Sequence, residues 1–163
     1  MLQYEQESLW DEETAKALPT SINIVTTKLV RERSALKGVN KISCPSDVYD
    51  LLSQYFNELD REHFLVVCLN RKSEVTCINT VSIGGLYSTT VHPREIFKVA
   101  ILSCADTVIL AHNHPSGDPN PSREDIEITR RIADAGQLMG INVHDHIIFG
   151  DGRYFSLKEK AVI

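Results

Sequence analysis

The chain has 163 residues, enough for one compact domain with a sizeable core. Its 42% apolar and 24% charged residues are ordinary for a globular protein, and no apolar run approaches the roughly 20 residues that cross a bilayer. The net charge of −5 argues against broad nucleic-acid binding, which usually requires a basic surface. The acidic N-terminus lacks the basic-then-apolar order of a secretory signal, so we expect a cytoplasmic protein without membrane contact.

The first quarter of the chain shows little periodicity. Residues 1–20 are polar and acidic and predict an arm outside the main core, whereas the β-branched residues of 21–30 predict a strand. Residues 34–42 contain a glycine and predict a loop. We therefore divide the chain into an N-terminal arm with a possible strand, residues 1–42, and a domain of residues 43–163.

A helix and two strands are expected next. Pro45 suits the first turn of a helix, and apolar residues at helical spacing continue it to about Leu59. The apolar run 63–69 predicts a buried strand. Residues 75–83 predict a second strand, which pairs back through a turn at 70–73.

Helices and strands alternate in the second half of the chain. Pro93 opens a helix, residues 107–111 predict a buried strand, and a loop rich in Pro and Gly leads to a helix over 122–139. Strands at 141–149 and 153–157 follow. This order predicts an α/β fold in which helices flank one mixed sheet.

The four cysteines do not form a metal or redox motif. No pair has the C-x-x-C spacing, and a cytoplasmic chain keeps its thiols reduced. Cys68 and Cys104 lie among apolar residues, which predicts that both are small buried side chains.

The segment 111–125 carries the chemistry of this sequence. His112 and His114 leave the end of a buried strand at i and i+2, a spacing that directs both imidazoles to one face. A rigid loop with three prolines then brings Asp125 into the first turn of the next helix. Two histidines and one carboxylate leave the fourth position of a zinc ion for water, as in catalytic sites.

Simpler roles exist for the same residues. Ser122 and Asp125 fit a helix-capping box, which is compatible with a metal role because a cap fixes the direction of Asp125. Two histidines in a turn can also hydrogen-bond their own loop. We favour metal binding because an acidic residue follows the histidine pair across a rigid loop.

The pattern His112-x-His114, seven residues, Ser122, two residues and Asp125 resembles the JAMM motif of MPN+ metalloproteases. The strings VHPREIFKVA, HNHPSGDPNPSREDIEITRR and DHIIFGDGRYFSL resemble the RadC family over about residues 43–160. The resemblance implies a JAB1/MPN-like fold of the cytidine deaminase type, with Zn²⁺ held by His112, His114 and Asp125. It also implies that Ser122 helps to stabilise the oxyanion. The implied function is a zinc-dependent hydrolase that cleaves a peptide or isopeptide-like amide.

The JAMM pattern also requires an upstream glutamate, after the first helix and at the start of the following strand. Glu62 occupies that place. We predict that it is the general base, which takes a proton from the attacking water and passes it to the leaving amine. Glu95 is the competing candidate, although the helix dipole explains a carboxylate in the first turn of its helix. Glu74 lies in a turn and is a poorer third candidate.

A second His-x-His motif, His144-Asp145-His146, lies within a predicted strand. It has no apparent third ligand, and the resemblance gives it no metal role. We therefore interpret these three residues as structural support for the site.

Longer RadC proteins carry an N-terminal helix-hairpin-helix region. Residues 1–42 are too short for it and lack its Gly-containing hairpin pattern, so the sequence resembles the shorter, single-domain relatives. One alternative function is DNA repair or DNA processing with another role for the metal. The acidic composition weighs against it, and residues 28–33 are the best candidate for a basic patch.

A further alternative is a metal-stabilised scaffold without turnover, against which the intact ligand set argues. Peptides, isopeptides and non-peptide amides all suit the predicted site, so a peptide or protein is the expected partner. The sequence indicates no oligomeric state.

Overall fold

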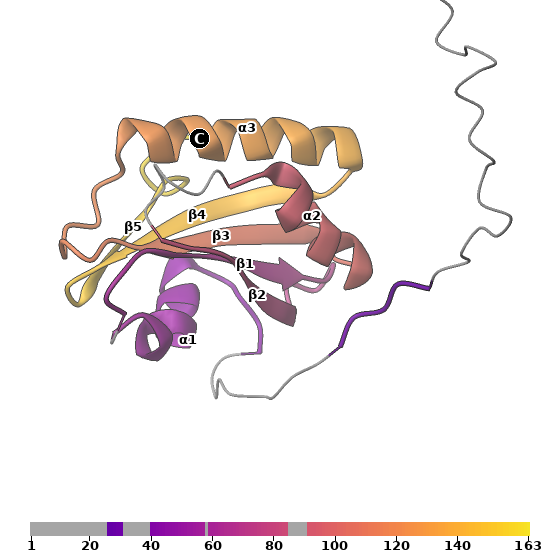
Figure 1. Cartoon of the computed structure of the whole chain (residues 1–163), viewed down its shortest axis with the longest axis horizontal. Helices are drawn as coiled ribbons and strands as arrows, with labels where there is room; N and C mark the ends of the chain where they lie inside the picture. The colour runs from indigo at the N-terminus through magenta and orange to yellow at the C-terminus, as the bar shows by residue number, and fades with distance from the viewer. Residues whose placement is uncertain (1–25, 31–39, 58, 85–90) are drawn as a thin grey trace, which may run out of the picture.

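The computed structural model describes residues 26–30, 40–57, 59–84 and 91–163. Its centre is a five-stranded sheet in the order β2-β1-β3-β4-β5 (Figure 1). The strands β3 and β4 run parallel, and the other neighbouring pairs are antiparallel. The elements, in chain order, are α1 (Pro45–Phe56), β1 (His63–Leu69), β2 (Val75–Ile83), α2 (Pro93–Leu102), β3 (Thr107–Asn113), α3 (Arg123–Met139), β4 (Asn142–Gly150) and β5 (Arg153–Ser156).

Helices cover both faces of the sheet. The helix α1 packs on one face, whereas α2 and α3 pack on the other (Figure 1). This arrangement confirms the predicted α/β class. None of the helices in the described ranges is both long and apolar enough to cross a membrane.

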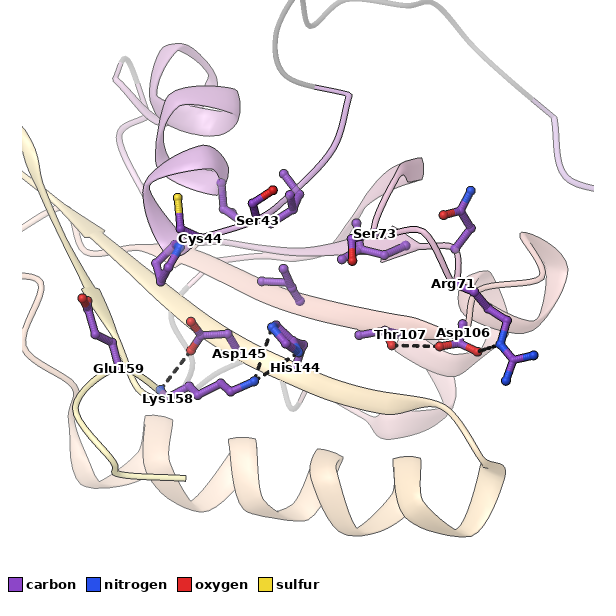
Figure 2. A pocket seen from close by; sticks show the side chains of 16 residues that line it. Ser43, Cys44, Arg71, Ser73, Asp106, Thr107, His144, Asp145, Lys158 and Glu159 are labelled. Atoms are coloured by element: carbon purple, nitrogen blue, oxygen red, sulfur yellow. Dashed lines mark hydrogen bonds and ion pairs between the residues drawn. The ribbon is translucent and has the colours of Figure 1, made fainter.

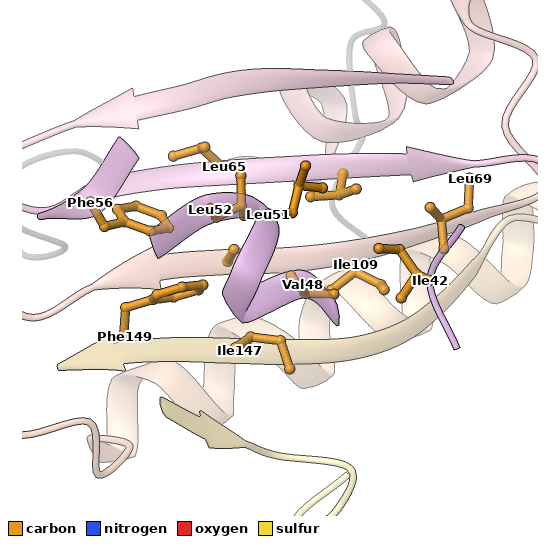
Figure 3. Close-up of a cluster of buried hydrophobic side chains, with 12 residues drawn as sticks. Ile42, Val48, Leu51, Leu52, Phe56, Leu65, Leu69, Ile109, Ile147 and Phe149 are labelled. Carbon is orange, nitrogen blue, oxygen red and sulfur yellow. The ribbon is translucent and has the colours of Figure 1, made fainter. Parts of the chain in front are cut away.

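The central strand β1 is apolar along its whole length because both of its faces are buried. Leu65 and Val67 join the cluster under α1, which Figure 3 shows. Phe64 and Val66 point to the other face and join the cluster under α2 and α3. The strands β1 and β2 have the predicted boundaries and pair antiparallel, as expected.

The helix α3 begins and ends as its sequence predicts. Ser122 is the N-cap, and its side chain accepts a hydrogen bond from the Asp125 amide at 3.1 Å. Gly140 closes the helix with a φ of 69°, a left-handed conformation that favours glycine. The cap fixes the position of Asp125 in the first turn.

Several predicted boundaries differ from the structure. The first helix ends at Phe56 rather than Leu59, and β3 continues through His112 and Asn113, whereas the sequence predicts that the strand ends at residue 111. Residues 26–30 are exposed and form no strand, because they pair with no neighbouring strand of the described sheet. The remainder of the predicted strand and the arm at 1–20 lie outside the described residues.

The two cysteine predictions have different outcomes. Cys68 is fully buried on β1, as predicted. The prediction for Cys104 is wrong, because its side chain is exposed. It follows α2 where the chain reverses toward β3, and it adopts a φ of 53° while its amide bonds the carbonyl of Ile101. Apolar neighbours in the sequence do not bury a residue that forms the outside of a turn.

Candidate metal centre

Three side chains from two elements meet at the C-terminal end of β3. His112 and His114 extend toward the N-terminus of α3, where Asp125 is positioned by its capping box. The Nε2 atoms of the two histidines are 3.0 Å apart, and they lie 3.2 and 3.4 Å from the two oxygens of Asp125. His112 and Asp125 are buried, while the side chain of His114 is 13% exposed. The sequence-predicted ligand set is therefore brought together, with one side open to solvent.

Both imidazoles are held through their outer nitrogens. Nδ1 of His112 lies 2.8 Å from Nε2 of His146, and Nδ1 of His114 lies 2.7 Å from the carbonyl oxygen of Asp118. The Asp118 carbonyl can only accept, so Nδ1 of His114 carries the proton and Nε2 presents its lone pair to the centre. The loop that supplies this carbonyl turns at Gly117, whose φ is 80° and where a side chain would collide with Asp151.

Asp125 uses its two oxygens differently. Its Oδ2 accepts hydrogen bonds from the amide and the hydroxyl of Ser122, at 2.7 and 2.6 Å. Among the residues that the structure describes, none gives a hydrogen bond to the buried Oδ1. A proton shared by the two Nε2 atoms would satisfy them but would leave Oδ1 without a donor. A metal ion satisfies all three atoms, so this cluster can hold one.

The charges at the cluster favour a cation. Burial by itself raises the pKa of Asp125, but the neighbouring imidazoles of His112 and His114 and the hydrogen bonds from Ser122 hold that pKa well below its usual range. The adjacent carboxylate of Asp125 in turn raises the pKa of His114. Burial keeps the pKa of His146 well below its ordinary value, so this residue stays neutral. The centre thus contains a permanent carboxylate beside two imidazoles.

The structure places Glu62 next to His114. Phe64 pairs with His112 across β1 and β3, so the antiparallel register puts Glu62 opposite His114. The negative charge of Glu62 also contributes to the raised pKa of His114. Glu62 itself is half-buried.

A buried amide that sequence reasoning missed fixes the backbone around Glu62. Oδ1 of Asn113 accepts a hydrogen bond from the His63 amide at 2.8 Å, and Nδ2 donates to the Arg61 carbonyl at 3.1 Å. The two bonded residues, Arg61 and His63, flank Glu62. Asn113 is the central residue of the first His-x-His motif, and nothing in its local sequence distinguishes it from an ordinary turn residue.

The other two glutamates considered from the sequence are engaged elsewhere. Glu95 accepts a hydrogen bond from Lys98, which lowers the pKa of Glu95, and Arg94 lies 3.8 Å away. Glu74 accepts from Asn70 in the turn between β1 and β2, at the end of β1 opposite Glu62. The geometry therefore favours Glu62 among the three.

The second His-x-His motif is split between two environments. His146 is fully buried behind His112, and Nδ1 of His146 lies 2.6 Å from Oγ1 of Thr129. His144 is exposed and lies beside Nζ of Lys158 at 3.2 Å. It lines a cavity of about 330 Å³ near the N-terminal ends of β3 and β4 (Figure 2), at the end of the sheet opposite the metal centre.

A second hollow, of about 280 Å³, borders the metal centre itself. Its lining includes Asn113 and His114 at the end of β3, Asn57 at the end of α1, and Phe149 and Gly150 of β4. The hollow leaves part of His114 open to solvent.

Comparison with known proteins agrees with this architecture. The RadC-like JAB domain family matches residues 42–162. A UPF0758 protein of Desulforamulus reducens is 56% identical over 122 residues, which are 75% of this chain and 54% of the relative. One from Desulfitobacterium hafniense is 52% identical over 122 residues, with the same coverage. One from Alkaliphilus metalliredigens is 52% identical over 142 residues, 86% of this chain and 61% of the relative.

The sheet, its flanking helices and the His-His-Asp cluster define a JAB-type domain. The chain belongs to the RadC family, which confirms the resemblance seen in its sequence. It spans about half the length of the curated relatives that it matches.

Proposed function

We propose that this protein is a zinc-dependent hydrolase of the JAMM metalloprotease type, which cleaves a peptide or isopeptide-like amide. The observation that carries the proposal is the convergence of three ligand atoms whose other bonds already point them inward. We assign proton transfer to Glu62, because the strand register sets its carboxylate opposite His114.

The spacing of the ligand atoms supports zinc as the metal. Bonds of about 2.0–2.2 Å in a tetrahedral site require ligand atoms separated by about 3.4 Å. The two Nε2 atoms are 3.0 Å apart, and Nε2 of His112 lies 3.2 Å from Oδ1 of Asp125. Nε2 of His114 lies 3.4 Å from the other carboxylate oxygen, Oδ2. Two imidazoles and one carboxylate are a donor set that leaves a position for water in catalytic zinc sites.

Zinc held by His112, His114 and Asp125 would polarise the substrate carbonyl and would lower the pKa of a water molecule to about 7. Glu62 takes a proton from this water as the water oxygen bonds to the carbonyl carbon. Glu62 then gives the proton to the amide nitrogen as the carbon–nitrogen bond breaks, so that a carboxylic acid and an amine form; the acid loses its remaining proton to solvent. The glutamate returns to its charged form after each cycle.

Ser122 has two roles in this proposal. Its amide and hydroxyl hold Asp125 in the ligand orientation. In the reaction, the hydroxyl turns from Asp125 Oδ2 to the oxyanion of the substrate, while the Ser122 amide keeps its bond to Asp125. Hydrogen bonds of this type contribute about 3 kcal/mol to transition-state stabilisation.

The proposal is tested by replacing the two candidate bases in turn. The assay uses a pool of internally quenched peptides and a second pool linked through a lysine side chain, each with zinc-loaded protein. We expect Glu62→Gln to retain zinc and to lose activity by about 10²–10⁴-fold. Glu95→Gln is the matched control and should keep full activity, because Glu95 bonds Lys98 on the exposed surface of α2.

Loss of activity in Glu95→Gln, with Glu62→Gln unaffected, would exchange the roles of the two glutamates. Activity that survives complete removal of zinc by a chelator would overturn the proposed reaction itself.

A further inference from the structure

A continuous chain of buried hydrogen bonds runs behind His112. Nδ1 of His112 lies 2.8 Å from Nε2 of His146, and Nδ1 of His146 lies 2.6 Å from Oγ1 of Thr129. The Thr129 hydroxyl donates to the backbone carbonyl of Asp125 at 2.5 Å. All four residues are fully buried. This series of hydrogen bonds therefore starts at one candidate ligand, His112, and ends on the backbone of another, Asp125.

The donor and the acceptor of every hydrogen bond in this series follow from its last group, the backbone carbonyl of Asp125. A backbone carbonyl can only accept, so the single hydroxyl proton of Thr129 points to Asp125. Oγ1 of Thr129 must then accept a proton from Nδ1 of His146. A neutral imidazole carries one N–H, so Nε2 of His146 accepts from Nδ1 of His112. Nε2 of His112 is left with its lone pair directed at the metal centre.

We propose that Thr129 is a positioning residue that selects the metal-binding tautomer of His112, acting through His146. The proposal deepens the function proposed above and rests on it for the role of the metal. If the protons ran in the opposite direction, Nε2 of His112 would carry a hydrogen aimed at Asp125 Oδ1. That tautomer cannot bind a metal through Nε2.

The fold explains why these residues can form the chain. Thr129 lies four residues after Asp125 on α3, the spacing at which a threonine hydroxyl reaches the carbonyl of the preceding helical turn. The parallel register of β3 and β4 pairs His146 with Leu110, two residues before His112 on the same strand. The helix α3 thus supplies Asp125 as one candidate ligand. Through Thr129 and His146 it also determines which nitrogen of His112, another candidate ligand, carries the proton.

The experiment compares zinc affinity in variants of the full chain, measured by competition with a chromophoric chelator. Thr129→Val keeps the shape of the side chain and removes the hydroxyl. We expect zinc affinity to fall by about 10- to 100-fold, as is typical when a partner of a metal-bound histidine is lost. Thr129→Ser should restore affinity to within about threefold of the starting protein, because serine can form the same two bonds. Thr107→Val, at the far end of β3, is the matched control and should not change it.

The second measurement is the tautomer of His112 in the metal-free chain, read from the NMR signals of its ring nitrogens. The proton should be on Nδ1 in the starting protein and in Thr129→Ser. A substantial population with the proton on Nε2 is expected in Thr129→Val. A merely structural role for Thr129 would lower stability without moving this signal.

A second pair of variants tests the middle of the chain. His146→Gln offers an amide oxygen in place of Nε2 and should retain most of the zinc affinity, whereas His146→Leu offers no acceptor and should lose it. This pair shows whether zinc binding requires an acceptor for the Nδ1 proton of His112, even if Thr129→Val fails to fold.

Each outcome separates this inference from the proposed function. If Thr129→Val binds zinc as tightly as the starting protein, or binds it weakly with an unchanged His112 tautomer, the positioning role is wrong. If the starting protein binds no zinc at all, the proposed hydrolase is wrong, and the tautomer signal alone still decides whether Thr129 controls His112.

Discussion

Two His-x-His motifs lie on adjacent parallel strands of this protein, yet they do different things. His112 lies in β3 and His114 directly follows it, and both direct Nε2 at Asp125 in the candidate metal centre. His146 supports His112 from behind, while His144 faces the cavity at the other end of the sheet. Identical spacing in the sequence therefore does not give identical placement.

A β-bulge explains the difference. Val108 pairs with Val143, but the next residue, Ile109, pairs with Asp145. His144 is thus an extra residue on β4, and the alternation of side chains between the two faces of the sheet is interrupted there. His146 remains on the face of α3 with His112, whereas His144 joins residues on the other face.

The central residues of the two motifs have similar roles. Asn113 and Asp145 are both buried, and both bind backbone groups with their side chains. Asn113 fixes the start of β1, while Asp145 fixes the segment after β5 through the Lys158 amide. In each motif the side chain of the middle residue bonds the backbone, and only the first motif contributes both of its histidines to the cluster that could hold a metal ion.

The largest expected effect separates the two motifs by metal content. His114→Ala should lose stoichiometric zinc, because two remaining ligands no longer close the site. His144→Ala, the equivalent change in the second motif, should keep it. The measurement is zinc per chain after dialysis, together with thermal unfolding. Saturating zinc, at about a thousand times Kd, stabilises a folded protein by about 4 kcal/mol. We expect that shift in His144→Ala and not in His114→Ala, and equal zinc content in both would contradict the ligand assignment.

An intermediate effect is expected at the centre of the second motif. Asp145 accepts hydrogen bonds from the amides of His146 and Lys158 and from the hydroxyl of Ser156. Asp145→Ala leaves these donors unsatisfied and should lower the free energy of unfolding by about 3 kcal/mol, measured by urea titration. The folded variant should still bind zinc. Asp134→Ala, on the exposed side of α3, is the control and should change stability by less than about 0.5 kcal/mol.

The smallest effect on stability is expected at the centre of the first motif. Asn113→Ala removes two hydrogen bonds to the backbone and should cost about 2 kcal/mol. Its effect on hydrolysis should be larger than its effect on zinc content, because the backbone beside Glu62 loses its support. Asn142→Ala, at the exposed start of β4, serves as control. A variant with normal activity and normal stability would show that Asn113 does not position Glu62.

Sequence patterns predicted the individual elements of this domain well. The periodicity of apolar residues placed β1 and β2 at their observed boundaries, and the capping residues placed α3. The His-x-His spacing and the acidic residue that starts the next helix predicted a cluster that the fold does assemble. These features are local, so a few neighbouring residues are sufficient to determine them.

Tertiary structure decided the features that depend on pairing between distant segments. Only the register of β3 against β4 places His146 under His112, and only the packing of α3 brings Thr129 to His146. The bulge at His144 and the exposure of Cys104 likewise arise where strands and helices meet. The sequence by itself determined which side chains are available for a metal site. The contacts between elements determined which of them face it, because side-chain direction depends on the partner strand as much as on the strand itself.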